Sequence, residues 1–548
     1  MFLLEAPSSA NRTDPIRIRR ERRAEPRSPS EEMDAPVAFT NILFEGADGP
    51  PPGAADVPDY AADLHLDDIV RAVTAGNEEH EFARIFFQPL RDTGAITYRH
   101  DVFRDLEDAA LLEAIRSFGR EMEVVQRRLA HASNASHPVD QERWLLGSAE
   151  VFRTAVVELN DKLRSARPNS TALSAFRDYV ADYVESAALT TLEADTRRVK
   201  AALHGVSYRL RIHGPKVTVT RDRPDPDYSA EVLETFAKFR QDGARKRYDW
   251  RFDQGSDMNH VEAAILERVA RLHPDVFATL HDYAERHRAF LDPTIARFDR
   301  EVRFYLAWLD FIERVQRGTD LRFCYPEVSR GSHAVDACRV FDLALAASLN
   351  GAGHRVVPNG IDLHGGERIV LVTGPNQGGK TTLARAVGQL HHLARIGVPV
   401  PGERVRLPLV DRIFTHFERQ ERVEDLSSKL EDDLRRIHTI LEQATPESLL
   451  ILNESFTSTT VDDQLFIGRR VMRQIVERGP LCVVVTFLDE LATLDPAIVS
   501  MVGTVDPADH TRRTFEIVRR PPDGLAYAMA IAEKHRVTYP SLKARLER

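Results

Sequence analysis

The chain has 548 residues, of which 43% are hydrophobic and 29% are charged, and its formal net charge is −10. This length exceeds what one hydrophobic core supports, so two or three domains are expected. An acidic chain binds nucleic acid only through local basic patches. Its three cysteines stand far apart, which argues against a disulfide framework and a zinc site, and no apolar run approaches membrane-spanning length. These features predict a cytoplasmic protein with no membrane partner.

Residues 1–60 are rich in Pro, Arg, Glu, Ser and Ala and have no apolar period, so we expect them to be disordered. Basic and acidic residues are mixed from Arg17 to Arg27, which fits either a solvated linker or a tail that binds nucleic acid. Met33 is a second candidate for the start of the protein.

Residues 61–320 have a mainly helical pattern. Apolar residues recur at steps of three and four, for example at Leu111, Ile115, Phe118 and Met122. Charged and apolar residues are interleaved over long runs, which predicts extended helices that pack on one another. No catalytic constellation falls in this region.

One interruption of the helical pattern, at residues 206–222, predicts a small β-hairpin around a Gly-Pro turn. Its alternation places apolar residues on one face and Arg209, Arg211 and Lys216 on the other. A second basic cluster follows at Arg245–Arg251. Both patches fit contacts with a nucleic-acid backbone, and they fit equally well a solvated strand face and a charged helix end.

Residues 321–548 change to an α/β pattern. Short apolar strands at 369–372, 449–452 and 482–485 alternate with helical stretches, which indicates a mainly parallel sheet. A hairpin of Val499–Val505 with Thr514–Val518 is expected to close that sheet.

The strand at 369–372 leads into a G-x-x-x-x-G-K-[ST] loop and then an amphipathic helix. In this context the loop aims backbone N–H groups at the phosphates of a nucleotide. We expect Lys380 to reach the β- and γ-phosphates of ATP and Thr381 to bind Mg²⁺. The expected nucleotide-binding residues are Gly374, Pro375, Asn376, Gln377, Gly378, Gly379, Lys380, Thr381 and Thr382.

The strand at 449–452 ends in Asn453 and Glu454. P-loop ATPases place a ligand of the metal and a catalytic carboxylate at this point. We therefore expect Asn453 to bind Mg²⁺ through a water molecule and Glu454 to act as the general base. Between the two motifs, Ser427 or Ser428 is a good N-cap for a helix that runs to about Gln443, and capping alone accounts for that composition.

Several ordered motifs make the second half resemble the ATPase domain of the MutS family of mismatch-repair proteins. The residues before 321 resemble, more weakly, the family's core and lever domain. The loop at 374–382 is similar to the family's G-P-N-x-G-G-K-[ST]-T. The other matching segments are Pro89–Asp92, Asp411–Thr415, Ser428–Asp433, Thr457–Asp462 and Thr486–Leu491.

The resemblance implies a helical core and lever domain followed by an ABC-type P-loop ATPase domain. It also implies a homodimer in which each ATP lies between the P-loop of one chain and the signature helix of the other. Ser428 would then contact the γ-phosphate across the interface, and closure of the dimer would move the helical arms around DNA.

The sequence departs from the family pattern in several places. We expect no mismatch-reading domain before the helical region and no Smr nuclease after the ATPase region. Phe487 stands where the family has a histidine, and Asn453 stands where Asp is usual. Two functions remain open: a DNA-clamping ATPase of repair or recombination, and a nucleotide-gated protein-interaction module with slow or vestigial hydrolysis and no mismatch recognition.

Overall fold

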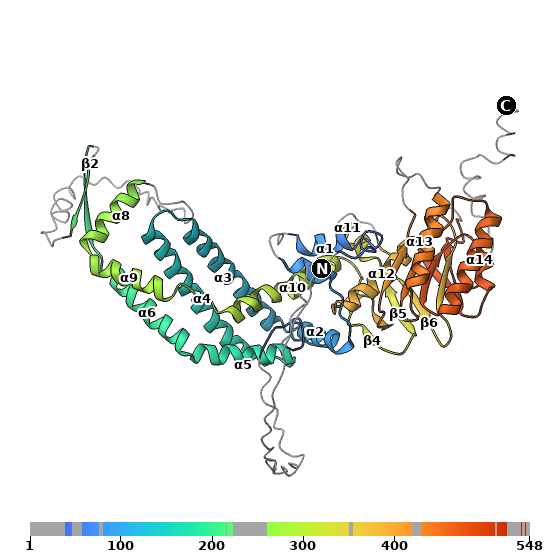
Figure 1. Ribbon diagram of the computed structural model, residues 1–548, viewed down its shortest axis with the longest axis horizontal. Coiled ribbons are helices and arrows are strands. Elements are labelled where there is room, and N and C mark those ends of the chain that lie inside the picture. The colour runs from blue at the N-terminus through green and yellow to red at the C-terminus, as the bar shows by residue number, and fades with distance from the viewer. Residues whose placement is uncertain are drawn as a thin grey trace, which may run out of the picture. The chain divides into compact units, whose positions relative to one another are not determined.

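The computed structural model describes residues 39–46, 57–75, 81–214, 216–222, 260–349, 355–418, 429–509 and 512–522, together with Tyr539 and Lys543. Ser428 and the basic cluster at 245–251 lie outside these residues, as do residues 1–38. The described residues are mixed helical and α/β, as predicted (Figure 1).

The expectation of disorder is wrong for residues 39–46. Ile42 and Leu43 are buried, and Glu301 accepts a hydrogen bond from the backbone N–H of Ile42 at 3.0 Å. The side chain of Asn41 accepts hydrogen bonds from Leu43 and Phe44 and so forms a local turn. The apolar residues of this segment therefore pack in the core although they show no sequence period.

Long helices make up the first half, and acidic or hydroxyl side chains begin several of them. Asp108 accepts hydrogen bonds from the first turn of α3, and Asp292 does the same for α10, where Pro293 fixes the first helical residue. Among the described residues no helix is long and apolar enough to cross a membrane. The helical elements are α1 (Leu66–Thr74), η1 (Glu81–Phe87), α2 (Thr93–Asp105), α3 (Ala109–Asn134), α4 (Pro138–Ala166), α5 (Thr171–Glu185), α6 (Ala187–His204), α8 (His260–Leu272), α9 (Pro274–Arg286) and α10 (Pro293–Gln316).

The hairpin consists of β1 (Tyr208–His213) and β2 (Lys216–Arg221), which pair antiparallel with Leu210 opposite Val219. Its apolar face is largely open to solvent, because Ile212 is 72% exposed.

Helix α10 belongs to the core that both halves share. Its Phe298 ring stacks on Phe176, with the ring centroids 3.6 Å apart. Further along the helix, the buried indole N–H of Trp308 donates to the carbonyl of Pro399 at 3.1 Å. Arg99, from α2, is buried and donates to the carbonyl of Ile396. These contacts fasten the helical half to the end of the helix that follows the P-loop.

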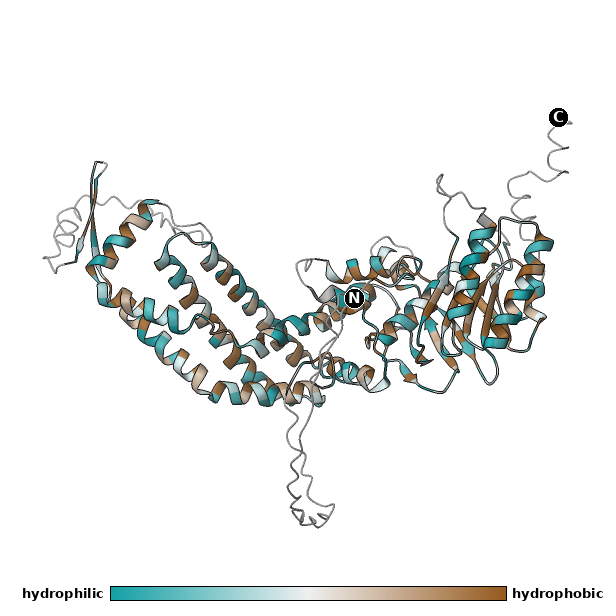
Figure 2. Ribbon diagram, in the orientation of Figure 1, coloured by the Kyte–Doolittle hydropathy of each residue, from teal (hydrophilic) through white to brown (hydrophobic). Residues whose placement is uncertain are grey.

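The second half is built on a six-stranded sheet in the order β10-β11-β12-β7-β13-β14, in which only β13 and β14 are antiparallel, as predicted. Apolar residues line its strands, as Figure 2 shows, because helices cover both faces of such a sheet. The strands are β7 (Ile369–Thr373), β10 (Ile413–His416), β11 (Leu449–Asn453), β12 (Leu481–Val485), β13 (Ile498–Val505) and β14 (Arg513–Arg519). The accompanying helices are α11 (Leu343–Leu349), α12 (Lys380–Arg395), α13 (Lys429–Gln443), α14 (Val461–Arg478) and η2 (Asp489–Thr493).

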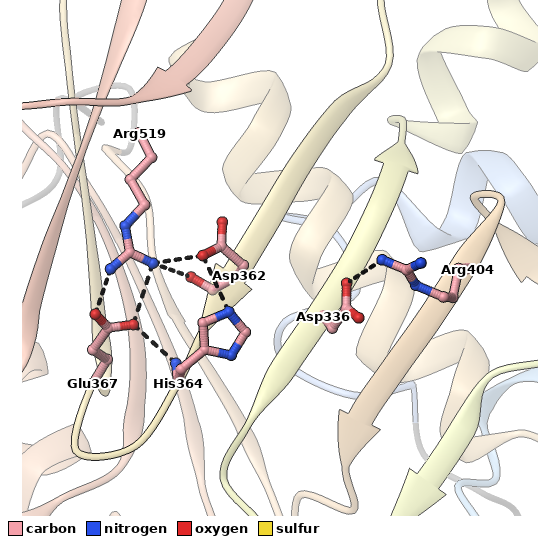
Figure 3. Close-up of polar contacts among 6 residues, drawn as sticks. All are labelled: Asp336, Asp362, His364, Glu367, Arg404 and Arg519. Carbon is pink, nitrogen blue, oxygen red and sulfur yellow. Dashed lines mark hydrogen bonds and ion pairs between the residues drawn. The ribbon is translucent and has the colours of Figure 1, made fainter.

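The second half also has a smaller sheet in the order β4-β9-β5-β6 and a pair of β3 with β8. These strands precede β7 in the sequence or fall between β7 and β10. Arg519 joins β14 to the end of β6 and to the turn before β7, because its guanidinium binds both Asp362 and Glu367 (Figure 3). In the same view Arg404 of β9 pairs with Asp336 of β5. The additional strands are β3 (Phe323–Cys324), β4 (Glu327–Ser329), β5 (Val335–Val340), β6 (Asn359–Leu363), β8 (Val400–Pro401) and β9 (Arg404–Pro408).

Candidate nucleotide-binding site

The loop between β7 and α12 needs its glycines. Gly374 has a φ of 121°, and a Cβ there would lie 2.8 Å from the backbone nitrogen of Gly503. Gly379 has a φ of 93° at the start of α12. Side chains disfavour such backbone angles, so the glycines allow the loop to turn tightly against β13.

Lys380 turns back onto its own loop. Its Nζ donates to the carbonyl of Gly374 at 3.0 Å and lies 3.4 Å from Oδ1 of Asn376. The same ammonium stands 4.1 Å from the ring centroid of Phe487, which is a cation–π contact. Burial lowers the pKa of Lys380, and the nearby Glu454 carboxylate opposes that shift.

Thr381 and Asn453 meet at the carboxyl edge of the sheet. The Thr381 hydroxyl donates to Oδ1 of Asn453 at 2.9 Å. The two residues come from different elements, but β7 and β11 both run parallel to β12, so the segments after them emerge at the same edge. Two neutral oxygen atoms therefore lie side by side next to the P-loop.

Glu454 begins an irregular turn directly after β11. Its φ is 50°, and the φ of Phe456 is 66°, so two residues with side chains occupy the left-handed region. The backbone N–H of Glu454 donates to the carbonyl of Val485 at 2.9 Å, and the ring of Phe456 is buried. These contacts hold a strained turn that places Glu454 on the wall of the cavity beside the loop.

That cavity has a volume of about 530 Å³ and is lined by Gln377 to Leu383 as well as by Glu454. Its other end is mainly apolar, and sequence reasoning missed it because these residues come from separate, short segments. Asn359 holds one side of this end, since its amide donates to the carbonyl of Phe515 and accepts from the N–H of Ile517. The apolar lining is Val340, Phe341, Leu345, Leu349, Val356, Val357 and Phe515.

A buried polar chain connects α13 to the turn after Glu454. Nε2 of His416, at the end of β10, lies 3.1 Å from the carboxylate of Asp433, and its Nδ1 lies 3.2 Å from the hydroxyl of Ser455. Burial acts to raise the pKa of Asp433, but hydrogen bonds from His416 and from the N–H of Phe456 bring it below its usual value. Sequence reasoning gave no signal for His416.

The structure brings most of the residues predicted for nucleotide binding together. The lining of the cavity includes Gln377, Gly378, Gly379, Lys380, Thr381 and Thr382. Three more loop residues have other contacts: Gly374 and Pro375 accept from Lys380, and the carbonyl of Asn376 accepts from Nε of Arg513. Of the predicted DNA contacts, Arg211 and Lys216 are exposed on the hairpin, whereas Arg209 is half-buried and pairs with Asp222 at 3.1 Å.

Comparison with known proteins places this site within a described family. The model of MutS domain V matches residues 370–536. An Endonuclease MutS2 of Gemmatimonas aurantiaca is 30% identical over 213 residues, which are 38% of this chain and 25% of the relative. A DNA mismatch repair protein MutS of Halalkalibacterium halodurans is 26% identical over 294 residues, or 50% of this chain and 32% of the relative. The match thus spans a quarter to a third of each of these two relatives. The match of residues 370–536 to MutS domain V and the likeness to these relatives support membership of the MutS family.

Proposed function

We propose that this chain is a MutS-like protein that binds and hydrolyses ATP with Mg²⁺ and clamps DNA as a dimer in repair or recombination. One observation carries the proposal: residues 377–382 of the P-loop and Glu454 line a single cavity, and Asn453 accepts a hydrogen bond from Thr381 of that lining. The apolar end of that cavity suits a nucleobase, and the P-loop end suits a triphosphate.

Thr381 and Asn453 fit a magnesium ion, because both present oxygen atoms, the ligand type that this hard cation prefers. When bound, the ion would neutralise charge on the phosphates. The loop N–H groups and Lys380 would bind the phosphates, after Lys380 leaves the carbonyls of its own loop. Glu454 would accept a proton from the attacking water, and the turn after β11 fixes its backbone for that role.

The names of the relatives support DNA repair as the setting, and the dimer follows from the family resemblance. Ser428 of a second chain would complete the phosphate site in this proposal. The basic face of the hairpin, with Arg209, Arg211 and Lys216, would contact the DNA backbone.

The deciding experiment compares the wild type with Glu454→Gln in ATP hydrolysis and in binding of a fluorescent ATP analogue, with and without duplex, branched and mismatched DNA. We expect the variant to bind nucleotide and to lose about 10²-fold or more of its turnover. A wild type that binds no nucleotide, or a variant that hydrolyses as fast as the wild type, would refute the enzymatic proposal.

A second candidate function is a nucleotide-gated module that grips another protein and turns over slowly. The contact between Lys380 and Phe487 favours it, as does the neutral side chain of Asn453 beside Thr381. This candidate predicts that ATP drives dimerisation while hydrolysis stays at background in the presence of every DNA tested. Sedimentation with ATP and a DNA-stimulated rate measurement separate the two functions.

A further inference from the structure

A large cleft outside the nucleotide site carries an unusual set of charges. It has a volume of about 2110 Å³ and lies between the loop after η1, the last turn of α12, the segment before β10 and the face of α13. Its lining includes Arg91, Arg330, Arg395 and Arg412. Among the described residues, none of these four arginines takes part in an ion pair, whereas many other arginines of the chain do.

The four arginines line the same cleft, and hydrogen bonds connect the segments that carry them. Arg330 donates to the carbonyl of Arg91, and the N–H of Leu90 donates to the carbonyl of Arg395 at 2.7 Å. Arg395 in turn donates to the carbonyl of Asp411 at 3.0 Å, and Arg412 follows directly. The guanidinium groups of Arg330 and Arg395 thus donate to backbone carbonyls, and among the described residues none of the four arginines forms a close ion pair with a carboxylate.

Arg395 is the buried member of this wall. Only 7% of its surface is exposed, and its Nε has no hydrogen-bond partner among the described residues. A buried guanidinium that forms no close ion pair is costly unless an anion compensates for it. Burial lowers the pKa of Arg395; Tyr60 and the Asp411 carboxylate oppose that shift, and the like charge of Arg91 adds to it.

The remaining lining indicates the kind of anion. Carboxylates are also present, at Asp59, Asp63, Asp411 and Glu447, and they oppose a continuous polyanion such as a nucleic acid. Aromatic and aliphatic side chains line the rest of the cleft, which exceeds the volume of about 300–1,000 Å³ typical of small-molecule sites. An extended ligand with separate acidic and apolar side chains matches both the mixed charges and the large apolar area of this lining. The apolar lining includes Phe44, Phe87, Leu90, Val410, Ile413 and Phe414.

We propose that this cleft is a docking site for an acidic, partly apolar peptide segment of a partner protein, whose carboxylates bind Arg91, Arg395 and Arg412. Arginine clusters recognise acidic motifs through paired N–H donors, and apolar side chains between the acids add area. The peptide would touch the last turn of α12, the helix whose first turn carries Lys380.

The test uses the full chain and a series of short synthetic peptides of constant Leu and Phe content, in which Asp and Glu replace Asn and Gln step by step. We expect affinity to rise with the number of acidic residues and to fall about tenfold or more in Arg91→Ala/Arg412→Ala. No described contact involves either of these side chains, so the double substitution leaves the fold intact. Arg71→Ala/Arg271→Ala removes the same charge from exposed positions and should bind like the wild type.

Two results would overturn the proposal. One is an affinity for the acidic peptides that is the same in the wild type and in Arg91→Ala/Arg412→Ala. The other is a single-stranded oligonucleotide that binds through the same two arginines more tightly than any peptide, which would make the cleft a nucleic-acid site.

A different observation carries a second inference, which rests on the proposed function. In the chain Asp433–His416–Ser455 the first two residues are buried and Ser455 is half-buried, and Asp433 also accepts from the N–H of Phe456. The chain meets the turn at Ser455, which directly follows Glu454 in the sequence, and at Phe456, the next residue. Because Glu454 and Phe456 have strained backbone angles, the turn requires such external contacts to keep its shape.

We infer that Asp433 and His416 are positioning residues for Glu454 and that they connect its orientation to helix α13. Helix α13 begins directly after Ser428, the residue predicted to contact the nucleotide of the partner chain. A movement of this helix would therefore change the orientation of the Glu454 carboxylate through Asp433 and His416.

Three variants test the inference by separating kcat from nucleotide affinity. His416→Phe and Ser455→Ala should lower kcat, by about tenfold or more for His416→Phe, with nucleotide affinity unchanged, and His416→Gln should recover part of the rate by restoring a donor to Asp433. Ser455→Ala covers the case in which His416→Phe does not fold. His438→Ala, at an exposed position of α13, is the control. A wild-type kcat in folded His416→Phe or in Ser455→Ala would refute the inference, whereas a wild type without any turnover would refute the proposed function instead.

Discussion

At the scale of single residues, Asn453 decides how strongly the site holds a cation. An amide oxygen lacks the negative charge that an aspartate would offer to Mg²⁺. Asn453→Asp keeps the shape of the side chain and adds that charge beside Thr381. We expect the variant to need less Mg²⁺ for half-maximal ATP hydrolysis, by about tenfold, which corresponds to about 1.4 kcal/mol.

A titration of the hydrolysis rate with Mg²⁺ at saturating ATP measures this change. Asn134→Asp, at the exposed end of α3 and outside the cavity, adds the same charge and serves as the control. An unchanged magnesium requirement in Asn453→Asp would place the metal elsewhere.

Phe487 also acts at this scale, because its ring stabilises Lys380 in the position folded back onto the loop. Phe487→Leu keeps an apolar side chain but removes the electrostatic attraction of the ring, worth about 0.5–2 kcal/mol. Lys380 then leaves its resting position more easily, so we expect ATP to bind severalfold more tightly. Fluorescence titration with an ATP analogue measures this, with Phe466→Leu on the exposed face of α14 as the control. Weaker binding would mean that the ring holds Lys380 in the position that ATP requires.

At the scale of elements, the segment 39–46 depends on α10. Burial raises the pKa of Glu301 to about 7 from the ordinary value of 4.5, although its hydrogen bond from Ile42 favours the carboxylate. The folded protein therefore binds a proton that the unfolded chain has released. The resulting contribution to the free energy of unfolding, about 3 kcal/mol, is fully present below about pH 4.5 and is lost as the pH rises through about 7.

Glu301→Gln keeps an acceptor for Ile42 and cannot ionise. We expect the melting temperature of the wild type to fall relative to that of the variant between about pH 5 and about pH 8. Thermal unfolding followed by circular dichroism at these two values measures the difference. Identical pH profiles would show that Glu301 stays ionised in the fold.

At the scale of the whole molecule, the hairpin is the surface through which we expect DNA to bind. Each phosphate contact that a cation makes releases counterions, so three contacts change the slope of log K against log salt by about 2.7. Arg209→Ala/Arg211→Ala/Lys216→Ala should therefore weaken DNA binding and flatten its salt dependence. Binding measured by fluorescence anisotropy over a range of salt concentrations tests this, with Arg71→Ala/Arg271→Ala as the control. An unchanged slope of log K against log salt would mean that these three side chains make no contact with DNA.

Local sequence patterns predicted the strands, and the regular geometry of a parallel sheet predicted which residues would meet at its edge. The strands at 369–372 and 449–452 could be recognised by their apolar runs, and because they are parallel, Thr381 and Asn453 had to emerge at one edge. Burial of Ile42 could not be predicted in this way, because its partner Glu301 lies 259 residues further along the chain. The same holds for the apolar end of the cavity, where Phe515 and Val356 line one space only in the folded protein.

The hydrogen bond between Thr381 and Asn453 has a consequence for the order of binding events. The Thr381 hydroxyl and the Asn453 amide oxygen are hydrogen-bonded to each other at 2.9 Å. A free cation would have to break this bond, so its net binding free energy is small. When the cation arrives bound to the triphosphate, the phosphates also contact the P-loop, and these contacts offset the lost hydrogen bond. We therefore expect the rate of nucleotide capture to follow the concentration of the Mg²⁺–ATP complex, and free Mg²⁺ added ahead of ATP to give no faster capture.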